Sequence, residues 1–184
     1  GLHNNVLFTP KAYKAWDEMM LRLQKNKETD VVLSISNLKK LTKNDSLQTF
    51  ELTNFVNLKK TTDPAYLKKI QKELFNDLPF YEGLLFNKKS GSIRAAVYLD
   101  KAIVNTPARQ DFIVHKLIPE MKLFKEKTGI DLRVSGMPYI RTMNAQTIIS
   151  EIGLFIGMSL LVTCLLFYFF FLLLQGKGSH LVIN

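Results

Sequence analysis

The residues that could carry out chemistry are few in this sequence, and they are widely spaced. The three histidines, His3, His115 and His180, lie far apart, and none has a cysteine or carboxylate at the spacing of metal ligands. His115 lies beside apolar residues on an expected helix, where we interpret it as a structural histidine. Asp17 and Glu18 are neighbours on another expected helix and point apart, so they do not form a catalytic pair.

Motifs that bring reactive groups together are also missing. The sequence contains no glycine-rich phosphate loop, no nucleophile elbow and no HExxH metal motif. Asn44-Asp45-Ser46 matches the glycosylation pattern, but a match this short arises easily by chance. We therefore predict that the protein is not an enzyme, and that it has no catalytic, cofactor-binding or metal-binding residue and no cofactor.

A long apolar run near the C-terminus is the strongest feature of the sequence. Residues 152–174 contain no charged side chain. A helix rises about 1.5 Å per residue, so this run covers the roughly 30 Å hydrocarbon core of a bilayer. A buried helix of a soluble protein would normally have a polar face. The run therefore predicts one transmembrane helix.

The same run limits what the span can do. Proton relays and ion sites need ionisable groups within the membrane, and residues 152–174 have none. Gly153 and Gly157 form a small-xxx-small pair, which would let another helix approach closely. A locally flexible helix is an equally good interpretation of the two glycines.

The charge of the protein belongs to the residues before this span. The formal net charge is +9, and many of the lysines come in scattered pairs. Nucleic-acid binding needs a concentrated basic stripe and a reading element, so we predict no nucleic-acid partner. Solvated surfaces explain the lysines best, and an anionic membrane surface is the alternative. The pairs are Lys39 and Lys40, Lys59 and Lys60, Lys68 and Lys69, and Lys88 and Lys89.

The compartment is constrained by two features. The one cysteine, Cys164, lies within the expected span, so no intrachain disulfide can form. The first residues lack the basic and then apolar pattern of a signal peptide. The domain before the span is therefore expected in the cytoplasm if the chain is made alone, or outside it if an earlier membrane segment precedes residue 1.

Three expected helices begin in the same way, with a capping residue before a proline at the first helical position. The pairs are Thr9-Pro10, Asp63-Pro64 and Thr106-Pro107. Apolar periodicity then predicts helices over 10–25, 64–78 and 107–129. Pro119, inside the third, predicts a kink or a break.

Strands are expected between these helices. Residues 84–86 and 92–99 flank 87–91, which has the composition of a hairpin loop. Further strands are expected over 31–36 and 131–135. The segment 38–61 is the least regular. Its apolar residues fit a short helix: Leu52, Phe55, Val56 and Leu58.

The order of elements predicts an α+β domain followed by one transmembrane helix. It fits a ferredoxin-like split β-α-β fold of the porter type, provided that the first strand is missing or lies at the N-terminal edge and that an insertion follows the second strand. We expect an extramembrane domain over 1–140, the span with its lead-in over 141–175, and a tail over 176–184. One core is expected from Leu33, Ile35, Ile93, Val97, Phe112 and Leu117.

The passage into the span resembles a known family. The stretch RVSGMPYIRTMNAQTIISEIGLFIGMSLLVTCLLFYFFF, residues 133–171, is similar to the junction between a porter domain and transmembrane helix 2 in the resistance-nodulation-division (RND) superfamily. The nearest branch is that of the bacterial MMPL-like, Patched-like exporters. In these relatives a strand ends in a Val-x-Gly-x-Pro turn, here Val134, Gly136 and Pro138, ahead of an aromatic-rich span.

The beginning of the chain resembles the same family. VLFTPKAYKAWDEMMLRL, residues 6–23, and VVLSISNL, residues 31–38, are similar to the first porter helix and the following strand, with Asn37-Leu38 at the strand's end. One departure concerns the end of helix 2, where relatives have a basic Phe-Arg-Ser-like sequence. Residues 172–180 read LLLQGKGSH instead, which suggests a truncation, a frameshift or added sequence.

The resemblance implies a fragment of a proton-driven exporter of lipophilic or amphiphilic substrates. The domain would be periplasmic, on the bacterial inner membrane, and would contact substrate or partner subunits. Helix 1 and the first porter strand would lie upstream, and the proton-coupling residues in a later span. Its partners would be the lipid bilayer, other helices of the same transporter, and either further copies of the chain or accessory subunits. The alternative is a complete single-pass protein with a basic interaction domain.

Overall fold

The computed structural model describes residues 1–44 and 49–178 of the chain. It divides into two compact units, Gly1–Tyr139 and Ile140–Asn184. The first unit combines helices with small antiparallel sheets, and the described residues of the second unit are helical. The α+β class expected from the sequence is confirmed at this level.

Helix α2 (Pro10–Gln24) is the central helix of the first unit. It follows the short strand β1 (Leu2–His3) and a single helical turn, α1 (Asn4–Leu7). Its start at Thr9-Pro10 is as predicted, because proline suits the first turn, where no intrahelical N–H bond is needed. One face is buried, and it consists of Ala12, Tyr13, Ala15, Trp16, Met19, Met20 and Leu23.

Helix α3 (Pro64–Asp77) also agrees with its prediction. The Asp63 side chain accepts a hydrogen bond of 2.8 Å from the Ala65 N–H and caps the helix. The helix buries Leu67, Ile70 and Leu74. The 3-10 turn η3 (Pro79–Tyr81) follows at once, since Pro79 cannot continue the helix.

The third predicted helix is continuous but irregular. It consists of α4 (Pro107–Phe112), the π-helical turn η4 (Ile113–Leu117) and α5 (Ile118–Thr128). The Ile118 N–H bonds to the Ile113 carbonyl, five residues earlier. A proline clashes with the carbonyl of the previous turn, and a π turn just before it relieves that crowding. The helix is therefore not broken at Pro119. Its last residue is Thr128, and it is capped by Gly129, where φ is +74°.

Besides the hairpin of residues 39–54, the described part of the first unit contains one antiparallel strand pair and one small three-stranded sheet. Strand β2 (Thr29–Leu33) pairs with β7 (Ala96–Leu99). Strand β6 (Ser92–Ile93) lies between β1 and β5 (Phe86–Asn87). The predicted hairpin is confirmed by the β5–β6 pairing. The single strand expected over 92–99 is wrong, because the chain leaves the ladder between β6 and β7.

The strand expected over 31–36 is also shorter than predicted. It ends at Leu33, and the chain turns through the 3-10 helix η1 (Ile35–Asn37). The Asn37 side chain causes the turn: its Oδ1 accepts from the Ser34 N–H at 2.8 Å, and its Nδ2 donates to the Val32 carbonyl. An asparagine that satisfies local backbone groups competes with a strand ladder.

The strand expected over 131–135 is not formed. This segment is extended, but its one backbone pairing is with the first residue of the chain. The Arg133 N–H donates to the Gly1 carbonyl at 3.1 Å, and the Gly1 amino group donates to the Arg133 carbonyl at 2.6 Å. A ladder one residue pair long is too short to count as a strand.

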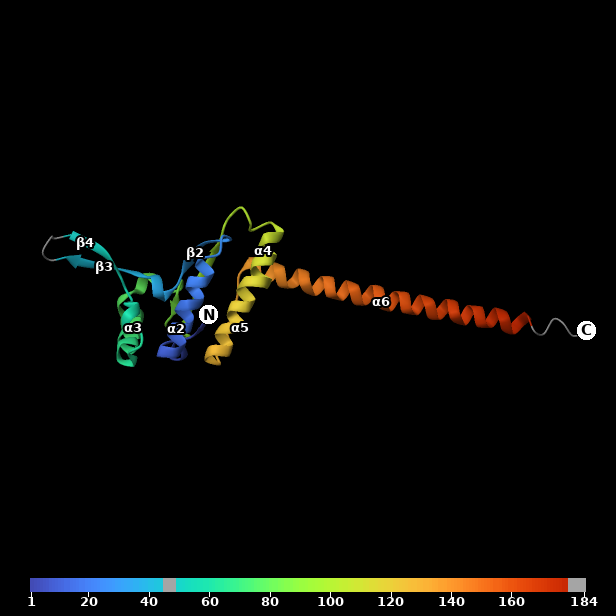
Figure 1. Ribbon diagram of the computed structural model, residues 1–184, viewed down its shortest axis with the longest axis horizontal. Coiled ribbons are helices and arrows are strands. Elements are labelled where there is room, and N and C mark those ends of the chain that lie inside the picture. Colours follow the sequence, from blue (N-terminus) through green and yellow to red (C-terminus); the bar gives the residue numbers. More distant parts are fainter. Residues whose placement is uncertain (45–48, 179–184) are drawn as a thin grey trace, which may run out of the picture. The chain divides into compact units, whose positions relative to one another are not determined.

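The segment 38–61 forms a hairpin rather than the expected short helix. Strands β3 (Lys39–Asn44) and β4 (Thr49–Asn54) pair antiparallel, and the 3-10 turn η2 (Leu58–Lys60) follows (Figure 1). Leu41 lies opposite Leu52, and both are exposed. The helical spacing was misleading: of the four apolar residues on which that prediction rested, Phe55 and Val56 are buried, whereas Leu52 and Leu58 are exposed.

The predicted core residues belong to one hydrophobic cluster. Ile35, Ile93 and Phe112 are fully buried. Leu33, Val97 and Leu117 are partly buried and pack against that cluster, so the prediction is confirmed. Helix α2 packs against α5, where the rings of Trp16 and Phe124 meet edge to face, with centroids 6.1 Å apart (Figure 1).

Helix α6 (Met137–Gly178) contains the whole run predicted to span a membrane. Its described part, Met137–Leu173, is long and apolar enough to cross a bilayer. No side chain of its apolar window is buried within the protein. Cys164 is exposed on this helix. An apolar surface of this length without a protein partner is typical of a helix surrounded by lipid.

Candidate functional site

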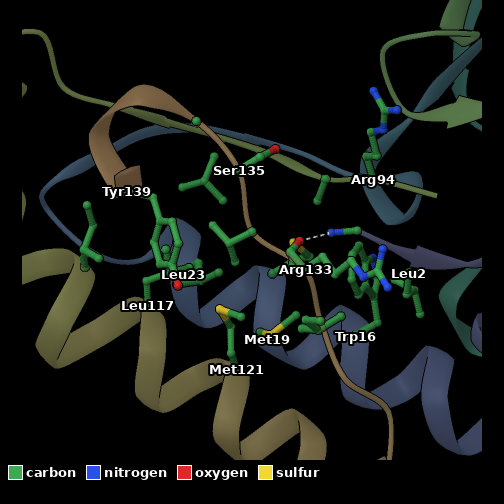
Figure 2. A pocket seen from close by; sticks show the side chains of 18 of the residues that line it. Leu2, Trp16, Met19, Leu23, Arg94, Leu117, Met121, Arg133, Ser135 and Tyr139 are labelled. Atoms are coloured by element: carbon green, nitrogen blue, oxygen red, sulfur yellow. Dashed lines mark hydrogen bonds between the residues drawn. The ribbon is translucent and has the colours of Figure 1, made fainter. Parts of the chain in front are cut away.

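A cavity of about 840 Å³ lies within the first unit. Its walls come from α2, from the α4–η4–α5 helix, from β6 and β7, and from the extended segment after Gly129 (Figure 2). Small-molecule sites measure roughly 300–1,000 Å³ and are mostly apolar with a few polar groups. The cavity has both properties, so it is the candidate functional site.

The helical walls of the cavity are apolar and adaptable. Trp16, Met19 and Leu23 lie on one face of α2, because their spacing of three and four residues matches the helical period. Leu117 and Met121 face them from the neighbouring helix (Figure 2). Methionine is flexible and polarisable, which suits a wall that must fit an apolar guest.

One buried donor in the wall has no partner. Trp16 is only 2% exposed, and its indole Nε1 makes no hydrogen bond to the described residues. The great majority of buried polar groups are hydrogen-bonded, so an unpaired donor beside a cavity calls for an explanation. The Nε1 atom itself has no accessible surface, so it is buried in the wall and is not exposed to the cavity.

Charged residues lie at the polar part of the lining. Arg94, Arg133 and Asp131 line the cavity. The Asp131 carboxylate is 2.7 Å from Lys125 Nζ, so its charge is balanced locally. The guanidinium of Arg94 is directed away from Trp16 and the apolar wall (Figure 2). Neither Arg94 nor Arg133 has a carboxylate partner in the described part of the chain.

The histidines singled out in the sequence are not brought together. His3 lines the cavity, and its Nδ1 accepts from the Asn5 N–H at 3.4 Å. His115 is exposed on η4, 3.9 Å from Asp111. Its interpretation as a structural histidine among apolar residues is wrong, because the helix turns the imidazole outward. His180 lies outside the described residues.

The two acidic neighbours of α2 have separate surroundings. Glu18 pairs with Lys127 at 3.0 Å. Burial raises the pKa of the Asp17 carboxyl, and the nearby Ser36 side chain offsets part of this effect. Asp17 and Glu18 therefore interact with different residues and do not act as a pair.

Metal ligands are not clustered in residues 1–44 and 49–178. No group of three His, Cys, Asp or Glu side chains in these ranges could hold an ion. Asp45 and Ser46 of the glycosylation pattern lie outside the described residues.

Three residues of the cavity wall, Val97, Phe112 and Leu117, were predicted from the sequence as core, and none was predicted as part of a site. Trp16 and Met19 have the periodicity of a packed face, and periodicity does not distinguish a filled interior from a hollow one. The one available signal was the cluster of methionines with the sole tryptophan of the chain on a single helix.

Comparison with known proteins found no match. No family model and no curated protein matches the sequence, and no solved structure matches the fold.

Proposed function

We propose that this chain is part of a proton-driven membrane exporter of the RND superfamily, MMPL-like branch. In this proposal the first unit is a porter domain on the periplasmic side of the bacterial inner membrane, and α6 anchors it. The observation that carries the proposal is the order in which the strands of the first unit pair, followed directly by a helix of membrane-spanning length.

The pairing order supports a ferredoxin-like domain. That fold interleaves two β-α-β units, so that a strand of each lies between strands of the other. Here the segment around Arg133 bonds to Gly1, β1 pairs with β6, and β7 pairs with β2. With β6 and β7 counted together as one interrupted third strand, this order is last, first, third, second. The β3–β4 hairpin, α3 and β5 lie between the second and third strands.

The role of the domain follows from what the chain contains. An apolar cavity with a polar end suits contact with lipophilic or amphiphilic substrates. Residues 152–174 contain no acidic, basic or histidine side chain for coupling to a proton gradient, so other helices of the same transporter would supply it. The bilayer and those helices are the proposed partners, together with further copies or accessory subunits.

A second candidate is a single-pass membrane protein with an interaction domain. The β3–β4 hairpin favours it, because Leu41, Phe50 and Leu52 are exposed on one face. An exposed apolar strand pair is a surface to which another protein can bind. In this reading the domain faces the cytoplasm.

The side of the membrane distinguishes the two candidates. We would replace Cys164 by serine and place a single cysteine at Lys59, which is exposed, in the chain expressed from its own gene. The exporter proposal expects labelling of intact cells, opened only at the outer membrane, by a membrane-impermeant maleimide. Labelling only after the inner membrane is disrupted would refute it and favour the second candidate.

A further inference from the structure

We infer that one face of the β3–β4 hairpin docks onto an anionic lipid surface. Leu41, Phe50 and Leu52 enter the boundary between the head groups and the acyl chains, and lysines at the base of the hairpin face the head groups. This contact with the bilayer is additional to the span, so the inference goes beyond the proposed exporter function. It assigns to lipid the surface that the second candidate function assigns to a protein, and the test distinguishes the two occupants.

The two faces of the hairpin differ in character. Successive side chains of a strand point to opposite faces. Leu41 lies opposite Leu52, and Phe50 comes two residues before Leu52, so these three side chains share one face. On the other face the hydroxyls of Thr42 and Thr53 meet, with their Oγ1 atoms 2.7 Å apart. One apolar face and one polar face are typical of an element that lies in the plane of a membrane interface.

The apolar face is unusually open to solvent. The exposed fractions are 59% for Leu41, 66% for Leu52 and 67% for Phe50. Among the large apolar side chains described before α6, only Phe80 is more exposed than these three. A single exposed leucine is ordinary, but several neighbouring apolar side chains without cover indicate an interaction surface.

The size of this face favours lipid over a protein partner. A stable protein–protein interface buries roughly 800 Å² on each partner. At the exposed fractions given above, three side chains supply roughly 300–400 Å². A lipid contact can be weaker, because α6 is long and apolar enough to keep the same chain at a bilayer. A tethered contact is strengthened by its high effective concentration.

The charge around the hairpin also favours lipid. Residues 39–60 contain five lysines and two acidic residues. Lys39 and Lys40 begin β3, and Lys59 and Lys60 end η2. None of these four lysines forms an ion pair within the described part of the chain. Lysine is depleted at protein–protein interfaces, whereas each lysine near an anionic lipid surface strengthens binding to it.

A fluorescent label on each face of β4 tests the docking. Cys164→Ser removes the natural thiol, and either Leu52→Cys or Thr53→Cys then carries a nitrobenzoxadiazole label. The full chain is reconstituted in vesicles of phosphatidylcholine and phosphatidylglycerol. We expect the label at position 52 to emit at shorter wavelength and to be quenched by lipids with a nitroxide near the head group. The label at position 53 should show neither effect, and vesicles of phosphatidylcholine alone should dock less of the label at position 52.

The apolar contribution is measured in the chain labelled at position 52. Phe50→Ser removes part of the apolar face and should lower the docked fraction. Leu21→Ser is the matched control, because Leu21 is an exposed leucine of α2 away from the hairpin. Trp16 is buried, so unchanged Trp16 emission shows that each variant is folded.

The charge contribution is measured with two pairs of lysines. Lys39→Gln with Lys40→Gln should lower the ratio of docked to undocked label about fivefold for each lysine. Lys68→Gln with Lys69→Gln removes the same charge from α3 and should change this ratio little. High salt should reproduce the effect of the first pair, because exposed charges are screened.

Four results would overturn the inference. Equal signals from positions 52 and 53 would mean that the hairpin does not turn its apolar face to lipid. A shorter wavelength at position 52 without nitroxide quenching would mean that a protein, here a second copy of the chain, covers the face. Equal docking with and without phosphatidylglycerol, or equal effects of the two lysine pairs, would remove the preference for anionic lipid. The maleimide labelling is independent of all four, so failure of the docking and failure of the exporter proposal are distinguishable.

Discussion

Arg22 of α2 and Glu120 of α5 form a bidentate ion pair that connects the two helices. Arg22 Nε lies 2.8 Å and 2.9 Å from the two carboxylate oxygens, and Nη2 lies 2.8 Å from Oε2. The hydrogen bond to Glu120 is the main reason that the pKa of the Arg22 guanidinium is raised. The pair spans 98 residues of sequence, so it stabilises tertiary rather than local structure.

Replacement of Glu120 tests how much this pair contributes. Glu120→Gln removes the charge and should lower the free energy of unfolding by about 1 kcal/mol, since both side chains are partly exposed and charge-assisted bonds are stronger than neutral ones. Denaturant unfolding of the full chain in detergent, followed by Trp16 fluorescence, measures the change. Glu126→Gln on the same helix is the control and should change little. Equal effects of the two substitutions would show that the pair adds nothing specific.

A second ion pair, between the turn before β2 and the helical turn η4, predicts a pH dependence. Glu28 is buried, and Lys116 Nζ lies 2.7 Å from its Oε2. The hydrogen bond from Lys116 holds the pKa of the Glu28 carboxyl below its ordinary value of 4.5. A carboxyl with a lowered pKa in the folded state stabilises the protein above its unfolded pKa, and this stability is lost as the pH falls through the folded pKa.

The stability of the chain should therefore decrease on acidification from about pH 5 to below pH 4. In Lys116→Met the carboxylate loses its partner, and the Glu28 contribution to that decrease should become smaller or change sign. Denaturant midpoints at pH 7, 5, 4 and 3 measure the effect, with Lys122→Met as the control for loss of one lysine. An identical pH profile for Lys116→Met and the natural chain would contradict the assignment.

Helices were predictable because their signals are local. The pairs Thr9-Pro10 and Asp63-Pro64 indicate where α2 and α3 begin, and the spacing of the apolar residues indicates which face of each helix is buried. Strands depend on distant partners and on side chains that compete with the ladder. The bonds of Asn37 to Ser34 and Val32 ended a strand that the alternation of residues extended further.

The hairpin and the cavity were missed for a related reason. Leu41 and Leu52 pair across β3 and β4 on an exposed face, so their hydrophobicity does not report burial. The cavity beside Trp16 depends on how closely 131–135 approaches α2, and a single sequence carries no signal for that spacing. What sequence could predict was the apolar face of α2, not the space in front of it.

Two strand positions test the core. Ile93 is fully buried in β6, whereas Val97 in β7 is only partly buried and lines the cavity. Ile93→Asp places an unpaired carboxylate in the interior and should cost several kcal/mol, on the order of the whole stability of a domain. Val97→Asp should cost less, because its carboxylate can reach the cavity. Melting temperatures of the two variants measure the order, and a larger loss for Val97→Asp would contradict this account of the core.

The final prediction concerns the apolar helix α6. Each arginine at the centre of a membrane-spanning helix costs about 2.5–3.5 kcal/mol of insertion free energy, and Leu161 and Leu165 lie one helical turn apart near the middle of 152–174. The double change Leu161→Arg, Leu165→Arg should therefore lower the fraction of the chain that resists extraction from membranes by alkaline carbonate. The matched change of both residues to alanine keeps the helix without charge and should remain resistant. Arginine and alanine variants that extract alike would mean that this stretch does not lie in the hydrocarbon core, and release of the natural chain by carbonate would mean that α6 is not a span at all.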